Sequence, residues 1–138
     1  CRTYVFLAAG HPLAGRPLIT LEDLAPYPCL SFDQGQSFYL AEEVYSTYHY
    51  RQVIKASDRA TLLNLMVGLD GYTLCSGILC EELNGDGYRA VPLDSDKIMH
   101  IGYVKRQGCV LSPLAKIYLE ELNRCNVNVL DHPAGPTR

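Results

Sequence analysis

The sequence contains no long hydrophobic run and no excess of basic charge. No apolar stretch approaches the roughly 20 residues of a membrane-spanning helix, and no signal-peptide pattern opens the chain. We therefore expect no membrane contact and no export. The formal net charge is -3, and the lysine and arginine residues are scattered along the chain. A nucleic-acid-binding surface needs a basic stripe, so we expect DNA contacts to lie outside this sequence.

Paired cysteines and metal-binding spacings are also missing. The six cysteines include no CxxC pair, and most lie in apolar runs (Cys1, Cys29, Cys75, Cys80, Cys109 and Cys125). We expect buried thiols in a reducing compartment, which indicates a cytoplasmic protein rather than one with three disulfides. The four histidines lack ligand spacing, and His11 is interpreted as a loop residue. The acidic loop at residues 94–97 lacks the glycine and the distal glutamate of an EF-hand. No metal site and no cofactor are predicted.

The composition is that of one globular domain. The chain has 138 residues, of which 48% are hydrophobic and 20% charged. This length allows a core of ordinary size. The sequence begins with a cysteine inside an expected strand and has no initiator methionine, so we expect it to be a fragment of a longer protein.

Apolar runs and capped periodic segments alternate along the chain. Strands are expected over residues 3–8, 29–32, 51–56, 72–76, 88–93 and 98–105. Helices are expected from residue 21, where Thr20 and Asp23 have the spacing of a capping box, over residues 38–48, over residues 78–83, and from residue 113, where a proline follows Ser112. Leu114, Ile117, Tyr118 and Leu122 give the last helix an apolar stripe of the kind that packs against a sheet. Residues 126–138 are expected to be a frayed tail. The alternation predicts an α/β fold with a largely parallel sheet.

The stretch around which this order is arranged covers residues 56–77. Ser57 or Asp58 can cap a helix whose leucines and methionine recur at spacings of three and four, and Asp70-Gly71 supplies a turn into the next strand. Ligands of such units bind at the carboxyl ends of the strands, before the helix N-termini. Ser57, Asp58 and Thr61 are therefore the first candidates for a binding site.

Several short motifs, taken in order, resemble the effector-binding domain of LysR-type transcriptional regulators. They are His11-Pro12-Leu13-Ala14, Leu21-Glu22-Asp23-Leu24-Ala25, the run from Gly68 to Leu74, Val91-Pro92-Leu93, and Leu111-Ser112-Pro113-Leu114-Ala115. Two departures concern the ligand site. Asp70 stands where the family commonly has glycine, and Cys75-Ser76-Gly77 replaces an apolar strand end that is followed by proline.

The resemblance implies a type 2 periplasmic-binding-protein-like fold, in which two α/β subdomains joined by crossover strands enclose a ligand cleft. Residues 1–125 would form part of such a domain. Within it, residues 12–95 would be the second subdomain, residues 1–11 and 96–111 crossover segments, and residues 112–125 a helix of the first subdomain. The helix-turn-helix domain that binds DNA in this family would lie outside the sequence.

The resemblance also places effector contacts at two loops, matched here by Gly35, Gln36 and Ser37 and by Ser57, Asp58 and Thr61. Ser76 and Gly77 form a weaker third patch. Two helix N-termini opening on one cleft suit a small effector, including a carboxylate or another anion. The alternative is that Ser37 and Ser57 only cap their helices, and the two interpretations have similar weight.

The predicted function is therefore small-molecule sensing by a transcriptional regulator, in which ligand binding shifts the conformation or the oligomer geometry. We expect the chain to self-associate through the crossover strands and the last helix, whose apolar surfaces it leaves uncovered. The sequence shows no catalytic constellation, so an enzyme is not predicted. Two alternatives stay open: an enzyme or solute-binding protein with the same fold, and a thiol-based redox sensor that uses Cys75 or Cys80.

Overall fold

The computed structural model describes residues 1–33, 50–79, 84–100 and 102–130, with side chains up to residue 124. The chain divides into two compact units. The larger unit comprises Arg2–Met99, and the smaller comprises Cys1 and His100–Arg138.

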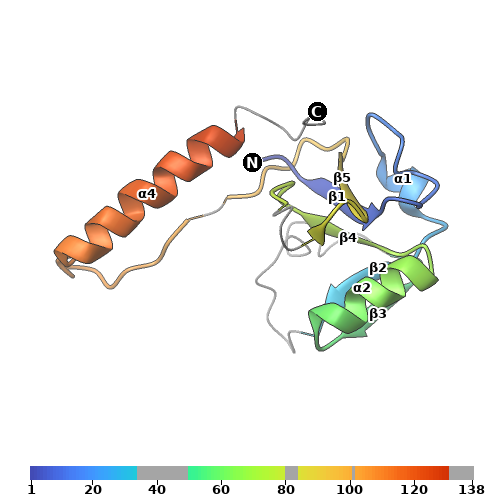
Figure 1. Cartoon of the computed structure of the whole chain (residues 1–138), viewed down its shortest axis with the longest axis horizontal. Coiled ribbons are helices and arrows are strands. Elements are labelled where there is room, and N and C mark those ends of the chain that lie inside the picture. Colours follow the sequence, from blue (N-terminus) through green and yellow to red (C-terminus); the bar gives the residue numbers. More distant parts are fainter. Residues whose placement is uncertain (34–49, 80–83, 101, 131–138) are drawn as a thin grey trace. The chain divides into compact units, whose positions relative to one another are not determined.

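In its described residues the larger unit contains five strands and two helices (Figure 1). The strands are β1 (Tyr4–Ala8), β2 (Cys29–Phe32), β3 (Val53–Ala56), β4 (Tyr72–Cys75) and β5 (Tyr88–Pro92), and the helices are α1 (Leu21–Leu24) and α2 (Arg59–Gly68). All five strands lie within two residues of the predicted positions. The helix predicted over residues 38–48 lies outside the described residues, as does most of the one predicted over residues 78–83. Ile78 and Leu79, where that second helix was expected to begin, are not helical.

The five strands form one sheet in the order β3-β2-β4-β1-β5. β2 is parallel to both β3 and β4, whereas β1 is antiparallel to both β4 and β5. Four strands therefore share one direction, and β1 runs against them. This arrangement confirms the α/β fold, but the sheet is mixed rather than largely parallel, because β1 pairs antiparallel with both of its neighbours. We call the edge at which β2, β3, β4 and β5 end the carboxyl edge; β1 begins there.

Alternating side chains of the strands supply two separate hydrophobic clusters. Val5 and Leu7 of β1 belong to one cluster, together with Leu24 of α1. Phe6, between them in sequence, belongs to the other, together with Leu62 and Met66 of α2. Successive side chains of a strand point to opposite faces of a sheet. The two helices thus cover opposite faces.

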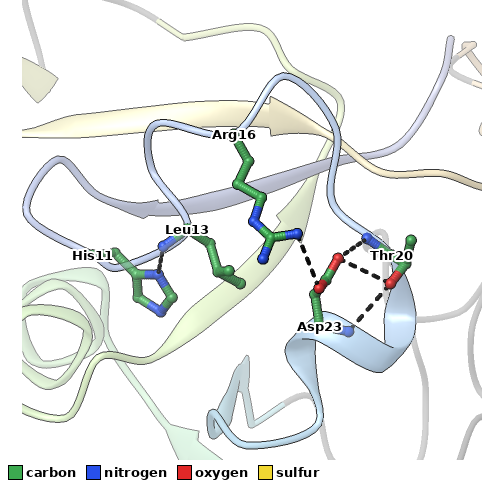
Figure 2. A network of polar contacts seen from close by, with 5 residues as sticks. All are labelled: His11, Leu13, Arg16, Thr20 and Asp23. Carbon is green, nitrogen blue, oxygen red and sulfur yellow. Dashed lines mark hydrogen bonds and ion pairs between the residues drawn. The ribbon is translucent and has the colours of Figure 1, made fainter.

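The loop between β1 and α1 is held by side-chain hydrogen bonds (Figure 2). Thr20 caps α1, and Asp23 bonds back to the backbone N–H of Thr20 at 3.0 Å, which completes the predicted capping box. Arg16 pairs with Asp23 at 3.2 Å. Nδ1 of His11 accepts from the Leu13 N–H at 3.0 Å, and its Nε2 lies 2.9 Å from the carbonyl oxygen of Asp70. His11 is therefore a loop residue, as predicted, and it is buried.

The smaller unit differs from the prediction in two respects. Residues 102–105, within the strand predicted over residues 98–105, form no strand. Ile98, at the start of that range and in the larger unit, makes a single bridge to Arg2. A strand requires backbone hydrogen bonds to a neighbour, which apolar character alone does not supply. Helix α4 (Pro113–Leu130) extends into the predicted tail. Its apolar stripe is exposed, as Leu114 at 76% and Tyr118 at 64% show, in agreement with the expectation that the chain leaves this surface uncovered.

Candidate functional site

The connections between strands indicate where a ligand would bind. The chain leaves β2 toward β3 on one side, whereas it leaves β4 toward β5 on the other side, past β1. The order of strands therefore reverses between β2 and β4. In open α/β sheets, ligands bind outside the carboxyl ends of the strands at such a switch point.

The pairing of β2 with its two neighbours is unequal. β2 pairs with β3 over all four of its residues, from Cys29 with Val53 to Phe32 with Ala56. With β4 it pairs only at its first residue, where Cys29 faces Tyr72. The Tyr72 N–H donates to the Pro28 carbonyl at 3.1 Å at this same end. Within the described residues, the ladder between β2 and β4 thus lies away from the carboxyl edge.

Ser57, Asp58 and Thr61 follow β3 at this edge and are all exposed. The structure selects Asp58 as the N-cap of α2. The Thr61 N–H donates to Oδ1 of Asp58 at 2.9 Å, and Oγ1 of Thr61 donates to Oδ2 at 2.7 Å. These two hydrogen bonds, the backbone bond first, hold the pKa of Asp58 below its ordinary value of 3.8. The Asp58 side chain is therefore charged at neutral pH.

This cap changes what the helix N-terminus can bind. The carboxylate of Asp58 already accepts a hydrogen bond from the first-turn N–H of Thr61. It also places a negative charge at the positive end of the helix dipole. A second anion there would be repelled. The N-terminus of α2 thus favours a hydrogen-bond donor over a carboxylate.

Ser76 and Gly77 follow β4 and lie next to the switch point. Gly77 has a φ of 80°, which favours glycine, and its N–H donates to Sγ of Cys75 at 3.3 Å. The ring of Tyr4, from β1, occupies the space where a side chain at position 77 would begin. Tyr4 thus lies against the Ser76–Gly77 turn, although the sequence alone did not single it out. Only the register between β1 and β4 brings it there.

Cys75 bears on the redox alternative. Burial raises the pKa of its thiol, and the hydrogen bond from the Gly77 N–H only partly opposes that effect. The thiolate is the reactive form, so this environment makes Cys75 a poor sensor. Cys80 lies outside the described residues.

Gly35, Gln36 and Ser37 also lie outside the described residues. The chain enters their stretch from the end of β2, where the Asp33 N–H donates to the Ala56 carbonyl at 3.0 Å. Ser57 and Asp58 lie at the end of β3, and Ser76 and Gly77 at the end of β4, with β2 between the two strands. The structure thus brings both described patches to one edge of one sheet.

Within residues 1–33, 50–79, 84–100 and 102–130, no group of three histidine, cysteine, aspartate or glutamate residues is arranged to hold a metal ion. None of the described helices is long and apolar enough to cross a membrane.

Comparison with known structures shows the same fold in LysR-family proteins. The PA01 protein of Pseudomonas aeruginosa, described as a LysR family transcriptional regulator, aligns with a TM-score of 0.63 and 17% identity over 91% of this chain. HinK, a LysR family transcriptional regulator from the same organism, aligns with a TM-score of 0.64 and 17% identity over 90%. The effector-binding domain of QuiR, in complex with shikimate, gives a TM-score of 0.57 and 16% identity over 92%.

This chain spans 46% and 44% of the two Pseudomonas chains and 62% of the QuiR domain. No match was found among curated protein sequences. The family model for the LysR substrate binding domain matches residues 1–125. That match covers most of the sequence, and the chain belongs to the LysR substrate-binding domain family.

Proposed function

We propose that this chain is the effector-sensing part of a LysR-type transcriptional regulator in the cytoplasm. A small molecule binds at the carboxyl edge and shifts the conformation or the oligomer geometry of the regulator, which controls transcription. The observation that carries this proposal is the match of residues 1–125 to the LysR substrate binding domain. DNA is contacted by a helix-turn-helix domain outside this sequence. The chain senses the molecule and does not transform it.

The effector site is proposed to surround the switch point between β2 and β4. Gly35, Gln36 and Ser37 follow β2, and Ser76 and Gly77 follow β4. Ser57, Asp58 and Thr61 follow β3 and form the flank of the site, where Asp58 acts as an acceptor. Residues 12–95 are assigned to the second subdomain, residues 1–11 and 96–111 to the crossovers, and residues 112–125 to a helix of the first subdomain. The shared direction of β2, β3 and β4 supports this location of the effector site, because the three strands end at the same edge of the sheet.

A thermal-shift screen of the purified chain tests the proposal. The panel consists of small hydroxylated carboxylic acids, amino acids and polyols, and it includes shikimate because the QuiR domain binds it. A compound present at about 100 times its Kd should add roughly 2.7 kcal/mol to the free energy of unfolding. If no compound in a broad panel raises the melting temperature, the sensing proposal fails.

Ser57 provides a sharp test of the flank. It is exposed and Asp58 is the cap, so Ser57→Ala should leave the stability of α2 unchanged. If Ser57 contacts the bound compound, its loss should weaken binding by about 1 kcal/mol, the scale of one hydrogen bond. Ser112→Ala, in the smaller unit, is the matched control and should leave the affinity unchanged. Equal affinities of wild type and Ser57→Ala would remove Ser57 from the site.

The two alternatives find less support. A redox sensor needs a thiolate, and burial raises the pKa of Cys75. An enzyme needs a nucleophile beside an oriented base, and His11, the buried histidine, is bonded instead to the Leu13 amide and faces the Asp70 carbonyl. Neither alternative is therefore preferred.

A further inference from the structure

Tyr4 and Gly77 make an unusually close approach at the carboxyl edge. A Cβ atom at Gly77 would lie 2.5 Å from Cδ2, 2.7 Å from Cε2 and 2.8 Å from Cγ of the Tyr4 ring. Real side chains do not tolerate such distances. The turn after β4 therefore lies directly on the aromatic ring, with only the hydrogens of glycine between them.

The ring is supplied by a strand that is fixed on both sides. Tyr4 pairs with Cys75 of β4 and with Pro92 of β5, so β1 is an interior strand at this point. An aromatic side chain on an interior strand has few alternative positions. The Tyr4 ring is therefore a rigid support for whatever lies on it.

The turn itself has two further features. Gly77 adopts a φ of 80°, and its N–H donates to Sγ of Cys75, two residues earlier, at 3.3 Å. A bond from an amide to a buried thiol is weak on its own. The Tyr4 ring thus gives the turn a second contact beside this weak bond.

We propose that Tyr4 is a positioning residue of the effector site: its ring holds the Ser76–Gly77 turn in the conformation that binds the effector. The inference rests on the proposed function, because it assumes that the turn beside the switch point contacts the effector. It assigns a role to a residue on β1, the strand that runs against the other four, and not to one in the loops that follow those strands. Tyr4 acts through the turn and need not touch the effector.

Hydrogen exchange tests the support without any ligand. Tyr4→Leu removes the flat ring and should accelerate exchange of the Gly77 amide by about tenfold or more, since the turn then opens more often. Tyr4→Phe keeps all three ring atoms that face Gly77 and should leave the rate within about twofold of wild type. Tyr103→Leu, at an exposed tyrosine of the smaller unit, is the matched control and should not change it.

A pair of glycine variants separates crowding from backbone strain. Gly77→Ala introduces both, because its φ is positive and the Tyr4 ring lies in the way. Gly85→Ala introduces strain alone, since its φ is 61° and nothing lies within 4 Å of the added carbon. Gly77→Ala should therefore disturb exchange in its turn more than Gly85→Ala does in its own. Adding Tyr4→Ala to Gly77→Ala should reverse part of this disturbance of amide exchange in the turn, because the obstructing ring is gone.

The binding readout uses the panel compound that gives the largest thermal shift with wild type. Tyr4→Leu should weaken its affinity by about tenfold, and Tyr4→Phe should restore it, at temperatures where all variants are folded. Unchanged exchange in Tyr4→Leu would overturn the proposed support. Faster exchange with unchanged affinity would overturn the effector role of Tyr4 and leave the ring purely structural. If no panel compound binds wild type, the proposed function and the effector role fail together, while the exchange result still decides the packing.

Discussion

The two units of this chain differ in what they do with their apolar residues. In the larger unit Val5, Leu7 and Leu30 are completely buried between the sheet and its helices. In the smaller unit Val110 is 87% exposed and Leu114 is 76% exposed. Residue types are similar in both, so composition does not explain the difference. Burial depends on whether neighbouring elements supply a complementary face, and among the described residues only the larger unit has them.

This difference also separates two kinds of surface. An exposed apolar stripe on a helix is characteristic of an interaction site rather than of a free surface. Leu114, Ile117 and Tyr118 all lie on α4 and are more than half exposed. The expectation that residues 3–8 leave a strand edge uncovered is wrong, because β1 pairs with β4 on one side and with β5 on the other. We therefore keep the proposal of self-association for α4 alone.

The largest effect is expected from truncating matched leucines in the two units. Leu7→Ala, at a fully buried position, should lower the free energy of unfolding by about 2 to 5 kcal/mol. Leu114→Ala should change it by less than about 0.5 kcal/mol, because the side chain is already in water. Urea unfolding followed by circular dichroism measures both. Similar losses in the two variants would show that α4 is packed against a core after all.

A charge on α4 should weaken self-association. Ile117→Lys places an ammonium group in the exposed stripe, and it should raise the dimer dissociation constant by about tenfold or more, or about 1.4 kcal/mol. Asn123→Lys, at a polar position of the same helix, adds the same charge as a control. Sedimentation equilibrium at micromolar concentration gives the constants. A wild-type chain that is monomeric under these conditions would contradict the proposal.

The helix caps allow a smaller comparison between the units. Thr20→Ala removes the acceptor for the Asp23 amide and should lower the stability of the larger unit by about 1 kcal/mol, whereas Thr20→Ser should retain most of it. Ser112→Ala removes the equivalent acceptor for the Ala115 amide at the start of α4. It should reduce helicity without moving the main melting transition. If both variants shifted that transition equally, the two units would unfold as one.

The smallest effect concerns acid stability. Hydrogen bonds from Thr61 keep the pKa of Asp58 below 3.8, so the unfolded chain binds this proton more readily than the folded chain. The resulting stabilisation is present above the ordinary carboxyl pKa and is lost as the pH falls through the lowered value. Asp58→Asn should flatten the decrease of the melting temperature between about pH 5 and pH 3. Ser112, which caps α4, does not titrate, so the helicity of α4 should not show this dependence on pH.

Much of the larger unit could be predicted because its signals are local. Thr20 and Asp23 lie three residues apart and form the expected capping box whatever surrounds them. Periodic leucines identified α2, and alternating strands and helices identified the α/β class. The choice between Ser57 and Asp58 as cap could not be made, because both are adjacent acceptors and the backbone geometry of the first turn decides between them.

The predictions that failed or were missed all concern contacts with segments distant in the sequence. The expected strand over residues 98–105 failed because apolar residues favour a strand but cannot provide the neighbour to which it must bond. Tyr4 was missed because it lies 73 positions from Gly77 in the numbering, and no periodicity relates residues so far apart.

The sequence by itself determined the elements that short-range forces dictate: the capped helices, the strands of the larger unit, the polar turns and the resemblance to the LysR effector-binding domain. Only the tertiary structure decided the order β3-β2-β4-β1-β5, the switch point between β2 and β4, and the contact between Tyr4 and Gly77. Caps and periodicity act within a few residues of the chain. Strand order and side-chain contacts depend on which distant segments bury their apolar faces together, and that choice is made by the whole core.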